Sequence, residues 1–246
     1  MNSLRSAISA IATIDGKPTG EHLLVCRFMK AVFNLKPALP RYNITWDPQI
    51  VLNYIVGLGP NNRLTILQLS RKLVMLMLLL SGQRGQTLHQ LDVRNMFLTL
   101  LKVIFTLGDL LKTSGPNSHL SQLVFKAYAP DRRLCVHTTL TSYLERTLDT
   151  RGKITSLFLT TTAPRKAASR DTIRRWTKDL MASADVDLSI FSPHSTRSAS
   201  ASTAAKYLPL STIVKSIGWS RAYFITYYHK PIQDSPFANA VLAHPK

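Results

Sequence analysis

The sequence predicts a mostly α-helical fold with one small antiparallel β-sheet, an α+β arrangement. Apolar residues recur at helical spacing along most of the 246 residues. Residues 96–128 are instead rich in apolar, β-branched and aromatic side chains, and the turn-prone "KTSGPNSH" interrupts them, which indicates a hairpin. Hydrophobic residues make up 45% of the chain, which is typical of a globular protein.

The front of the chain is predicted to hold two helices, at 4–14 and 21–35, joined by the turn "DGKPTG". The prolines of "KPALPRYN" at 36–43 break this pattern, so we expect a linker there. Beyond it, Asp47 is placed as a helix cap and Pro48 as the first helical residue of "WDPQIVLNYIVGL". A second, larger region therefore begins after the linker.

The larger region is predicted to continue with helices around a hairpin. A buried helix at about 64–81 ends at Gly82, because glycine favours the left-handed C-terminal cap. The remaining expected elements are helices at 85–91, 134–148, 170–183, 193–207 and 210–218, with a possible short strand "SLFLT" at 156–160.

The charge of the chain points to a polyanionic partner. Lys and Arg number 31 against 13 Asp and Glu, a net charge of +18. Nucleic acid is the first candidate, because neutralising backbone phosphates releases counterions and drives binding. An anionic membrane surface is disfavoured, since the basic residues are dispersed rather than gathered on one amphipathic helix. The longest apolar run, "LVMLMLLL" at 73–80, is too short to cross a bilayer.

The cysteines indicate neither a metal site nor a disulfide framework. Cys26 and Cys135 lie far apart and lack the spacing of metal ligands, so we expect two reduced thiols in an intracellular protein. The N-terminal residues show no secretory cleavage pattern.

The stretch "FSPHSTRSASAS" contains the first candidate functional pair. Ser192 and Pro193 are typical of a helix start, and on such a helix His194 and Arg197 share a face. Both lie in the first turns, where free N–H groups and the helix dipole favour an anion. The pair predicts a phosphate or carboxylate pocket, and the ordinary alternative is a half-buried histidine beside a surface arginine.

Phosphate chemistry would need a second arginine and a mobile lysine. Arg84 follows the buried helix after a Ser-Gly break, although an arginine there can also simply cap the helix. Lys112 lies at the edge of the predicted hairpin, where a solvated turn lysine is the plainer interpretation.

A nucleophile is expected in "GWSRAYFITYYHKP". Tyr223 and Tyr227 would share one helical face, and Phe224 and Tyr228 the next. Most of these rings should pack in a core, but one hydroxyl among them could attack a phosphate.

The chain resembles the tyrosine recombinases, the phage-integrase superfamily, in three stretches: "SGQRGQTLHQLD", "HSTRSASAS" and "GWSRAYFITYYHKP". The chain is similar in particular to one branch, the recombinases of DIRS-like and Ngaro-like retroelements. That similarity lies in the stretches "GKPTGEHLLVCRFMKAVFNLKPALPRYNITWD", "LLKTSGPNSHLSQLVFKAYAPDRRLCV" and "HSTRSASAS". The resemblance runs from about residue 4 to about 233.

The resemblance implies a role for each residue of the set. Arg84 and Arg197 would clamp the non-bridging oxygens of the scissile phosphate, which suits the planar guanidinium. His194 would bind the same phosphate and assist proton transfer from the nucleophile.

The other implied roles concern the bond that breaks. Tyr228 would attack and form a 3′-phosphotyrosyl bond, Lys112 would protonate the departing 5′ oxygen, and Trp219 would pack against the site and donate its indole N–H. By the same resemblance, the chemistry needs no metal and no other cofactor. The basic residues expected to bind DNA are Arg165, Lys166, Arg170, Arg174 and Arg175.

Two positions depart from the family pattern. Most relatives have an acidic residue three positions after the first arginine, where this chain has Thr87. The spacing from Trp219 to Tyr228 is about one residue shorter than in close relatives, which leaves Tyr227 open as an alternative nucleophile.

The resemblance also divides the chain. Residues 1–35 are expected to be a remnant of an N-terminal helical core-binding domain, 36–43 a linker, 44–228 the catalytic domain and 229–246 a tail. The implied function is integration of circular mobile-element DNA by a homotetramer on double-stranded DNA in the nucleus. The alternatives are a non-catalytic DNA-binding remnant of a mobile element and a monomeric topoisomerase-like activity.

Overall fold

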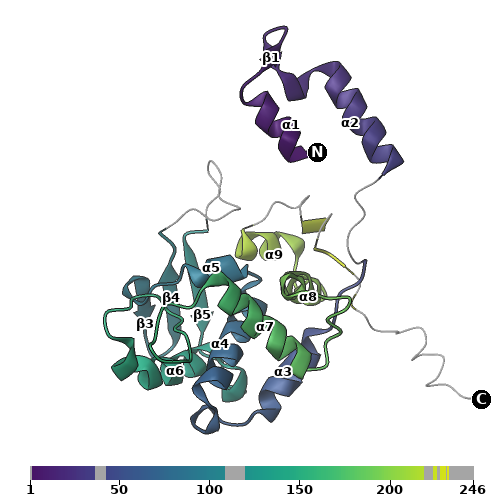
Figure 1. Ribbon diagram of the computed structural model, residues 1–246. Helices are drawn as coiled ribbons and strands as arrows, with labels where there is room; N and C mark the ends of the chain where they lie inside the picture. Colours follow the sequence, from purple (N-terminus) through teal and green to yellow (C-terminus); the bar gives the residue numbers. More distant parts are fainter. Residues whose placement is uncertain are drawn as a thin grey trace, which may run out of the picture. The chain divides into compact units, whose positions relative to one another are not determined.

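The computed structural model describes residues 2–36, 43–108, 120–218, 224–225, 228–230 and 232. The chain divides into two compact units, Met1–Arg41 and Tyr42–Lys246. The described residues are mostly helical, and their strands form two small antiparallel sheets (Figure 1). The predicted fold class is confirmed.

The first unit consists of two helices joined by a β-hairpin. Its elements are α1 (Asn2–Ser9), β1 (Thr13–Ile14), β2 (Lys17–Pro18), the 3-10 turn η1 (Thr19–Glu21) and α2 (Leu23–Leu35). The prediction of a helix over 4–14 was wrong beyond Ser9. Asp15 and Gly16 both have positive φ, +50° and +74°, and this backbone closes a tight hairpin between β1 and β2.

The first unit buries little apolar surface. Gly20 is the one buried residue of 3–36, and its N–H donates to Ser9 Oγ at 2.6 Å. Leu4 and Ile8 of α1 and Phe28 of α2 remain 65%, 41% and 57% exposed. Hydrogen bonds of the turn therefore hold α1 and α2 together more than a hydrophobic core does.

The second unit contains the other helices and a three-stranded sheet (Figure 1). Its helical elements are α3 (Pro48–Gly57), η2 (Asn61–Arg63), α4 (Ile66–Ser81), α5 (Gly85–His89), η3 (Val93–Asn95), η4 (Arg132–Leu134), α6 (Val136–Arg151), α7 (Arg170–Ser183), η5 (Pro193–Ser195), α8 (Thr196–Ala204) and α9 (Leu210–Ile217).

Helix α4 is the central element of the second unit. It begins with a capping box, in which the Thr65 hydroxyl accepts from the Gln68 N–H and the Gln68 side chain accepts from the Thr65 N–H. Residues such as Leu73 and Leu76 have no exposed surface, because α4 packs against α6, α7 and α8. It ends at Gly82, as predicted, with φ +62° at the cap.

The sheet lies beside α6. Strands β3 (Met96–Leu98), β4 (Lys102–Thr106) and β5 (Gln122–Lys126) pair antiparallel in that order. Val103 and Phe125 are buried register partners, and their exposed neighbours alternate with them, as expected for a sheet with one face on the core. The predicted hairpin thus has a third strand, because the chain turns at Thr99, whose N–H donates to the Lys102 carbonyl.

The later helices match the sequence pattern with two differences. Helix α7 has the predicted bounds, and Ser169 caps it by accepting from the Thr172 N–H at 3.1 Å. The single helix expected at 193–207 is a 3-10 turn, η5, followed by α8, which ends at Ala204. The residues 156–160 make isolated bridges at Ser156 and Leu159 rather than a strand.

Candidate active site

His194 and Arg197 lie where η5 passes into α8. Pro193 occupies the first turn of η5, as predicted, but Ser192 makes no side-chain capping bond there. Instead the Ser195 hydroxyl donates to the Ser192 carbonyl at 2.7 Å and closes the turn. This turn leaves His194 exposed, whereas Arg197 enters the interior with 1% of its surface exposed.

The hydroxyl of Tyr228 lies between these two side chains. His194 Nε2 is 3.1 Å from it, and Arg197 donates to it through a terminal nitrogen at 3.5 Å. The Arg197 Cζ is also 4.9 Å from the centre of the Tyr228 ring. A hydroxyl in this position can give its proton to an unprotonated His194, and the guanidinium then faces the developing negative charge.

A small apolar cluster holds the Tyr228 ring. Tyr228 is 6% exposed and packs with Phe224, Ala201, Ile213 and Ile217, from α8, α9 and the segment that follows. The N–H groups of Tyr228 and His229 both donate to the Phe224 carbonyl, at 2.9 and 3.0 Å. Next to this cluster, burial lowers the pKa of Lys230 below its ordinary value.

Arg197 also joins α8 to the end of α4. Its Nε donates to the Gly82 carbonyl at 3.0 Å. Gly82 is required there for two reasons. Its φ of +62° favours glycine, and a Cβ at this position would lie 2.8 Å from Ile217 Cδ1. The side chain of Gln83 donates to the Ile217 carbonyl at 3.1 Å and fixes the same turn to α9.

Arg84 follows this fixed turn as the N-cap residue of α5. Its side chain is half-buried and makes no hydrogen bond or ion pair to the described residues. Thr87, where the resemblance implied an acidic residue, is buried, and its backbone N–H donates to the Arg84 carbonyl at 2.9 Å. The bonds of Gly82 and Gln83, rather than a carboxylate, thus hold the backbone before Arg84.

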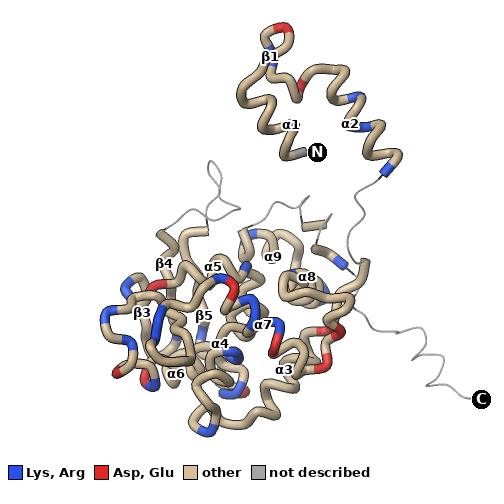
Figure 2. Tube along the Cα trace, in the orientation of Figure 1, with Lys and Arg blue, Asp and Glu red and all other residues tan. Residues whose placement is uncertain are grey.

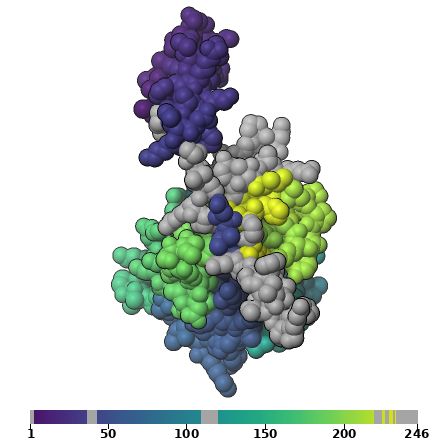
Figure 3. Space-filling view, turned by 90° about the vertical axis from the view of Figure 1, so that its right-hand side faces the viewer, coloured from purple at the N-terminus to yellow at the C-terminus, as the bar shows by residue number. Residues whose placement is uncertain are grey.

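Thr45 and Trp46, which precede α3 and which sequence reasoning missed, support the same site. Trp46 is 2% exposed and donates its indole N–H to Ser195 Oγ at 2.8 Å, next to His194. Its neighbour Thr45 forms a parallel bridge with Ile232, four residues after Tyr228. Figure 3 shows blue residues that precede α3 beside yellow residues near the end of the described chain. No local sequence signal marks either contact, because each joins residues far apart in the chain.

The basic residues predicted to bind DNA divide into two groups. Arg170, Arg174 and Arg175 are exposed on α7, where Figure 2 shows blue segments along the helix. Arg165 instead turns its guanidinium to the Thr160 carbonyl at 2.8 Å, and Lys166 is exposed beside it. Helix α7 packs against η5, which carries His194, and against α5, whose N-cap residue is Arg84.

Other predicted site residues lie outside the described residues. These are Lys112, Trp219 and the alternative nucleophiles Tyr223 and Tyr227. The described part of the site therefore comprises Arg84, His194, Arg197 and Tyr228. It brings the last three together within hydrogen-bonding distance.

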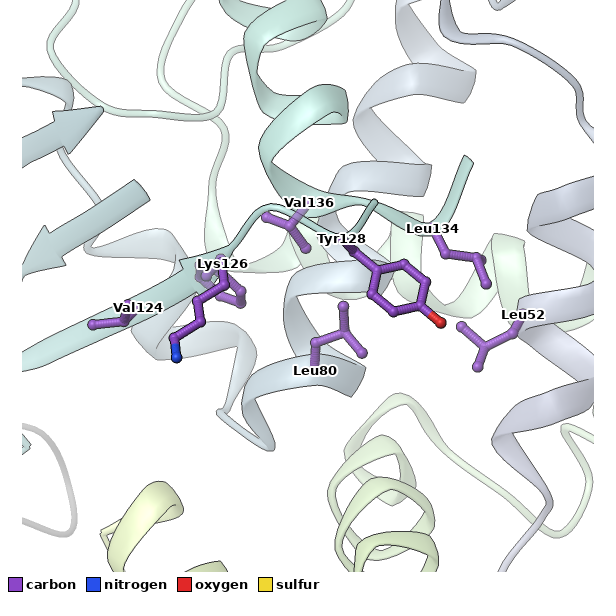
Figure 4. A pocket seen from close by; sticks show the side chains of 8 residues that line it. Leu52, Leu80, Val124, Lys126, Tyr128, Leu134 and Val136 are labelled. Atoms are coloured by element: carbon purple, nitrogen blue, oxygen red, sulfur yellow. The ribbon is translucent and has the colours of Figure 1, made fainter. Parts of the chain in front are cut away.

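An apolar pocket of about 380 Å³ lies elsewhere in the second unit (Figure 4). In Figure 4 the Tyr128 ring faces the side chains of Leu80 and Leu52. Its lining is Leu52, Leu80, Val124, Phe125, Lys126, Tyr128, Leu134 and Val136. None of these residues pairs a nucleophile with a base, so the pocket does not replace the His194 cluster as candidate site.

Two further searches concern metals and membranes. Within the described ranges, no group of three or more His, Cys, Asp or Glu side chains lies together as a metal site would require. In the same ranges, every helix is too short or too polar to span a bilayer.

Solved structures share this fold, although no family model and no curated protein matches the sequence. XerA recombinase is 18% identical with a TM-score of 0.56, over 90% of this chain and 74% of that one. XerH site-specific recombinase, bound to a palindromic difH substrate in a post-cleavage complex, is 13% identical with a TM-score of 0.58, over 98% and 64%. The Tn1549 transposon integrase, in complex with transposon right end DNA, is 16% identical with a TM-score of 0.53, over 99% and 79%. This chain therefore has the fold of the tyrosine recombinases.

Proposed function

We propose that this protein breaks and rejoins DNA through a covalent bond between Tyr228 and a 3′ phosphate. The observation that supports the proposal most is the position of the Tyr228 hydroxyl, between His194 Nε2 at 3.1 Å and the Arg197 guanidinium at 3.5 Å. The fold and the net charge of +18 agree with a DNA substrate.

In the proposed reaction the Tyr228 oxygen attacks the scissile phosphorus and its proton passes to His194. The bond from phosphorus to the 5′ oxygen breaks, and that oxygen takes a proton from Lys112, the acid implied by the resemblance. Arg84 and Arg197 neutralise the phosphate oxygens meanwhile. Attack by a 5′ hydroxyl of a second strand reverses these steps and joins the strands.

The biological role that fits this chemistry is integration of circular mobile-element DNA. Two duplexes would be exchanged by a homotetramer, with double-stranded DNA as the partner and the nucleus as the location. Residues 1–35 would act as part of a helical DNA-binding domain, and 44–228 as the catalytic domain. Arg170, Arg174 and Arg175 would contact the DNA backbone from α7.

The test is trapping of the covalent complex. The protein is incubated without metal or nucleotide, in the presence of a chelator, with a pool of nicked duplexes of randomised sequence, and is then separated on a denaturing gel. We expect a protease-sensitive adduct in the wild type and in Tyr128→Phe, which alters an exposed tyrosine of the apolar pocket. We expect none in Tyr228→Phe.

The possible results separate the alternatives. An adduct that persists in Tyr228→Phe would assign the nucleophile to Tyr227 or Tyr223. Salt-dependent DNA binding without any adduct would contradict the proposal and favour a non-catalytic DNA-binding protein. Relaxation of supercoils without joining of two duplexes would indicate the topoisomerase-like activity.

A further inference from the structure

Ser202 makes two hydrogen bonds to the backbone of the Tyr228 segment, at Tyr228 and at Lys230. Its hydroxyl donates to the Tyr228 carbonyl at 2.9 Å and accepts from the Lys230 N–H at 3.0 Å. The side chain is 4% exposed, so water competes little with either bond. Ser202 lies in α8, five residues after Arg197.

These two bonds complete the attachment of the tyrosine backbone. The Tyr228 N–H already donates to the Phe224 carbonyl at 2.9 Å, so both polar groups of this residue have a partner. Fixing the backbone on both sides of the Cα atom fixes the direction in which the side chain leaves it. Together with the apolar cluster that packs around the ring, this direction places the hydroxyl 3.1 Å from His194 Nε2.

Ser202 lies on the same helix as Arg197, the side chain proposed to bind the phosphate. Arg197 and Ser202 both belong to α8, and His194 immediately precedes that helix in η5. Helix α8 and the turn before it therefore carry both the residue that binds the Tyr228 backbone and the two side chains that contact the Tyr228 hydroxyl. In this arrangement, a shift of the Tyr228 segment along α8 would change the distance between reacting groups directly.

We infer that Ser202 is a positioning residue, which holds Tyr228 of the same chain against His194 and Arg197 for attack. The inference rests on the proposed function, in which Tyr228 is the nucleophile. Ser202 touches no reacting atom, and it acts through the backbone of residues 228–230.

The experiment compares Ser202→Ala with two other variants. Ser198→Ala is the matched control, because Ser198 is 1% exposed on the same helix but its hydroxyl donates only to the Ser195 carbonyl of the adjoining turn. Ser202→Thr is the rescue variant, since it keeps the hydroxyl. Each is measured for DNA affinity, thermal midpoint, rate of covalent adduct formation on bound DNA and exchange of the Lys230 amide hydrogen.

We expect Ser202→Ala to bind DNA as the wild type does but to form the adduct about 10- to 100-fold more slowly. The Lys230 amide should exchange faster, because its acceptor is lost. Ser198→Ala should keep the wild-type rate, and Ser202→Thr should recover most of it.

Other results would overturn the inference. A wild-type adduct rate in Ser202→Ala would do so while leaving the proposed function intact, and so would an unchanged exchange of the Lys230 amide. Equal losses of rate and of thermal midpoint in Ser202→Ala and Ser198→Ala would show a general structural role. If the wild type itself forms no adduct, the proposed function is contradicted. In that case the exchange of the Lys230 amide still tests whether Ser202 holds the backbone of residues 228–230.

Discussion

Arg197 donates through Nε to the Gly82 carbonyl while a terminal nitrogen of the same guanidinium reaches the Tyr228 hydroxyl. One side chain therefore joins the end of α4 to the candidate nucleophile. Because only 1% of Arg197 is exposed, its charge has little water around it, and these contacts set its orientation.

Replacing Arg197 by lysine tests whether adduct formation needs only the positive charge of Arg197 or also the shape of its guanidinium. Arg197→Lys keeps the positive charge but cannot donate to Gly82 and the tyrosine at once, since an ammonium has no planar fork. We expect adduct formation on bound DNA to fall by about 10²–10³-fold. Single-turnover trapping measures it, with Arg133→Lys as the control because Arg133 is exposed and paired with Asp131. An unchanged rate in Arg197→Lys would show that charge alone suffices.

Trp46 and Ser195 should prove energetically coupled. The hydrogen bond between them is buried and spans 149 residues of sequence. Trp46→Phe should lower the free energy of unfolding by about 1–3 kcal/mol, since it removes the donor and leaves space behind the smaller ring. Urea unfolding of both single variants and the double variant Trp46→Phe/Ser195→Ala measures the coupling, expected at about 0.5–1.5 kcal/mol. If the loss of stability in the double variant equals the sum of the losses in the two single variants, the hydrogen bond contributes no coupling and the prediction is wrong.

Lys72 should make stability depend on pH. It has no exposed surface, and its Nζ has no hydrogen-bond partner among the described residues. The pKa of Lys72 is lowered from 10.5 to about 8, chiefly by burial. The nearby Asp131 raises this pKa, and Arg133 lowers it. Below pH 8 the folded protein carries the cost of a buried charge. Between pH 8 and 10.5 the unfolded chain binds more protons, so stability should rise with pH.

The variant Lys72→Met removes this contribution. Its free energy of unfolding at pH 7 should be about 1–3 kcal/mol higher than that of the wild type, because the cost of burying the charge is gone. Its rise in stability between pH 8 and 10.5 should be smaller than that of the wild type, and Lys230, whose pKa burial also lowers, contributes to what remains. Denaturant unfolding at several pH values gives both quantities. Lys153→Met, at an exposed position after α6, should change neither. A Lys72→Met protein that gains as much stability over this interval as the wild type would assign the titration to another group.

The exposed arginines of α7 should contribute to the salt dependence of DNA binding. Replacing Arg174 by alanine removes about one phosphate contact, so the slope of log K against log salt should become less negative by about 0.9. Arg175→Ala should do the same. Arg94→Ala is the control, because Arg94 is exposed but paired with Asp92. Fluorescence anisotropy at several salt concentrations measures the slopes, and equal slopes for all three variants would remove α7 from the DNA interface.

Elements with a strong local signal could be predicted from the sequence. Helix α7 has a serine cap at Ser169 and an amphipathic pattern, and α4 ends at Gly82, as glycine predicts. Where a tight turn overrides the periodic pattern, the prediction was wrong. The apolar spacing of residues 4–14 indicated a helix, but Thr13 and Ile14 belong to a hairpin that Asp15 and Gly16 close with positive φ.

The candidate site was predictable only in part, for a similar reason. His194, Arg197 and Tyr228 were found because their residue types and order resemble a known family, and their roles remain proposals. Trp46 and Ser202 were not found, because each acts through hydrogen bonds to segments 149 and 26–28 residues away. Such contacts leave no periodic or local pattern in a single sequence.

The bridge between Thr45 and Ile232 brings one of the first described residues of the second unit next to its last described residue. Two points of a chain that adjoin in this way can be connected by a short linker, and the chain can be reopened elsewhere without loss of its interior packing. The exposed turn at residues 128–131, between β5 and η4, offers such an opening. Circular permutation would then place both new ends in that turn and leave α4, α8 and Tyr228 within one continuous polypeptide.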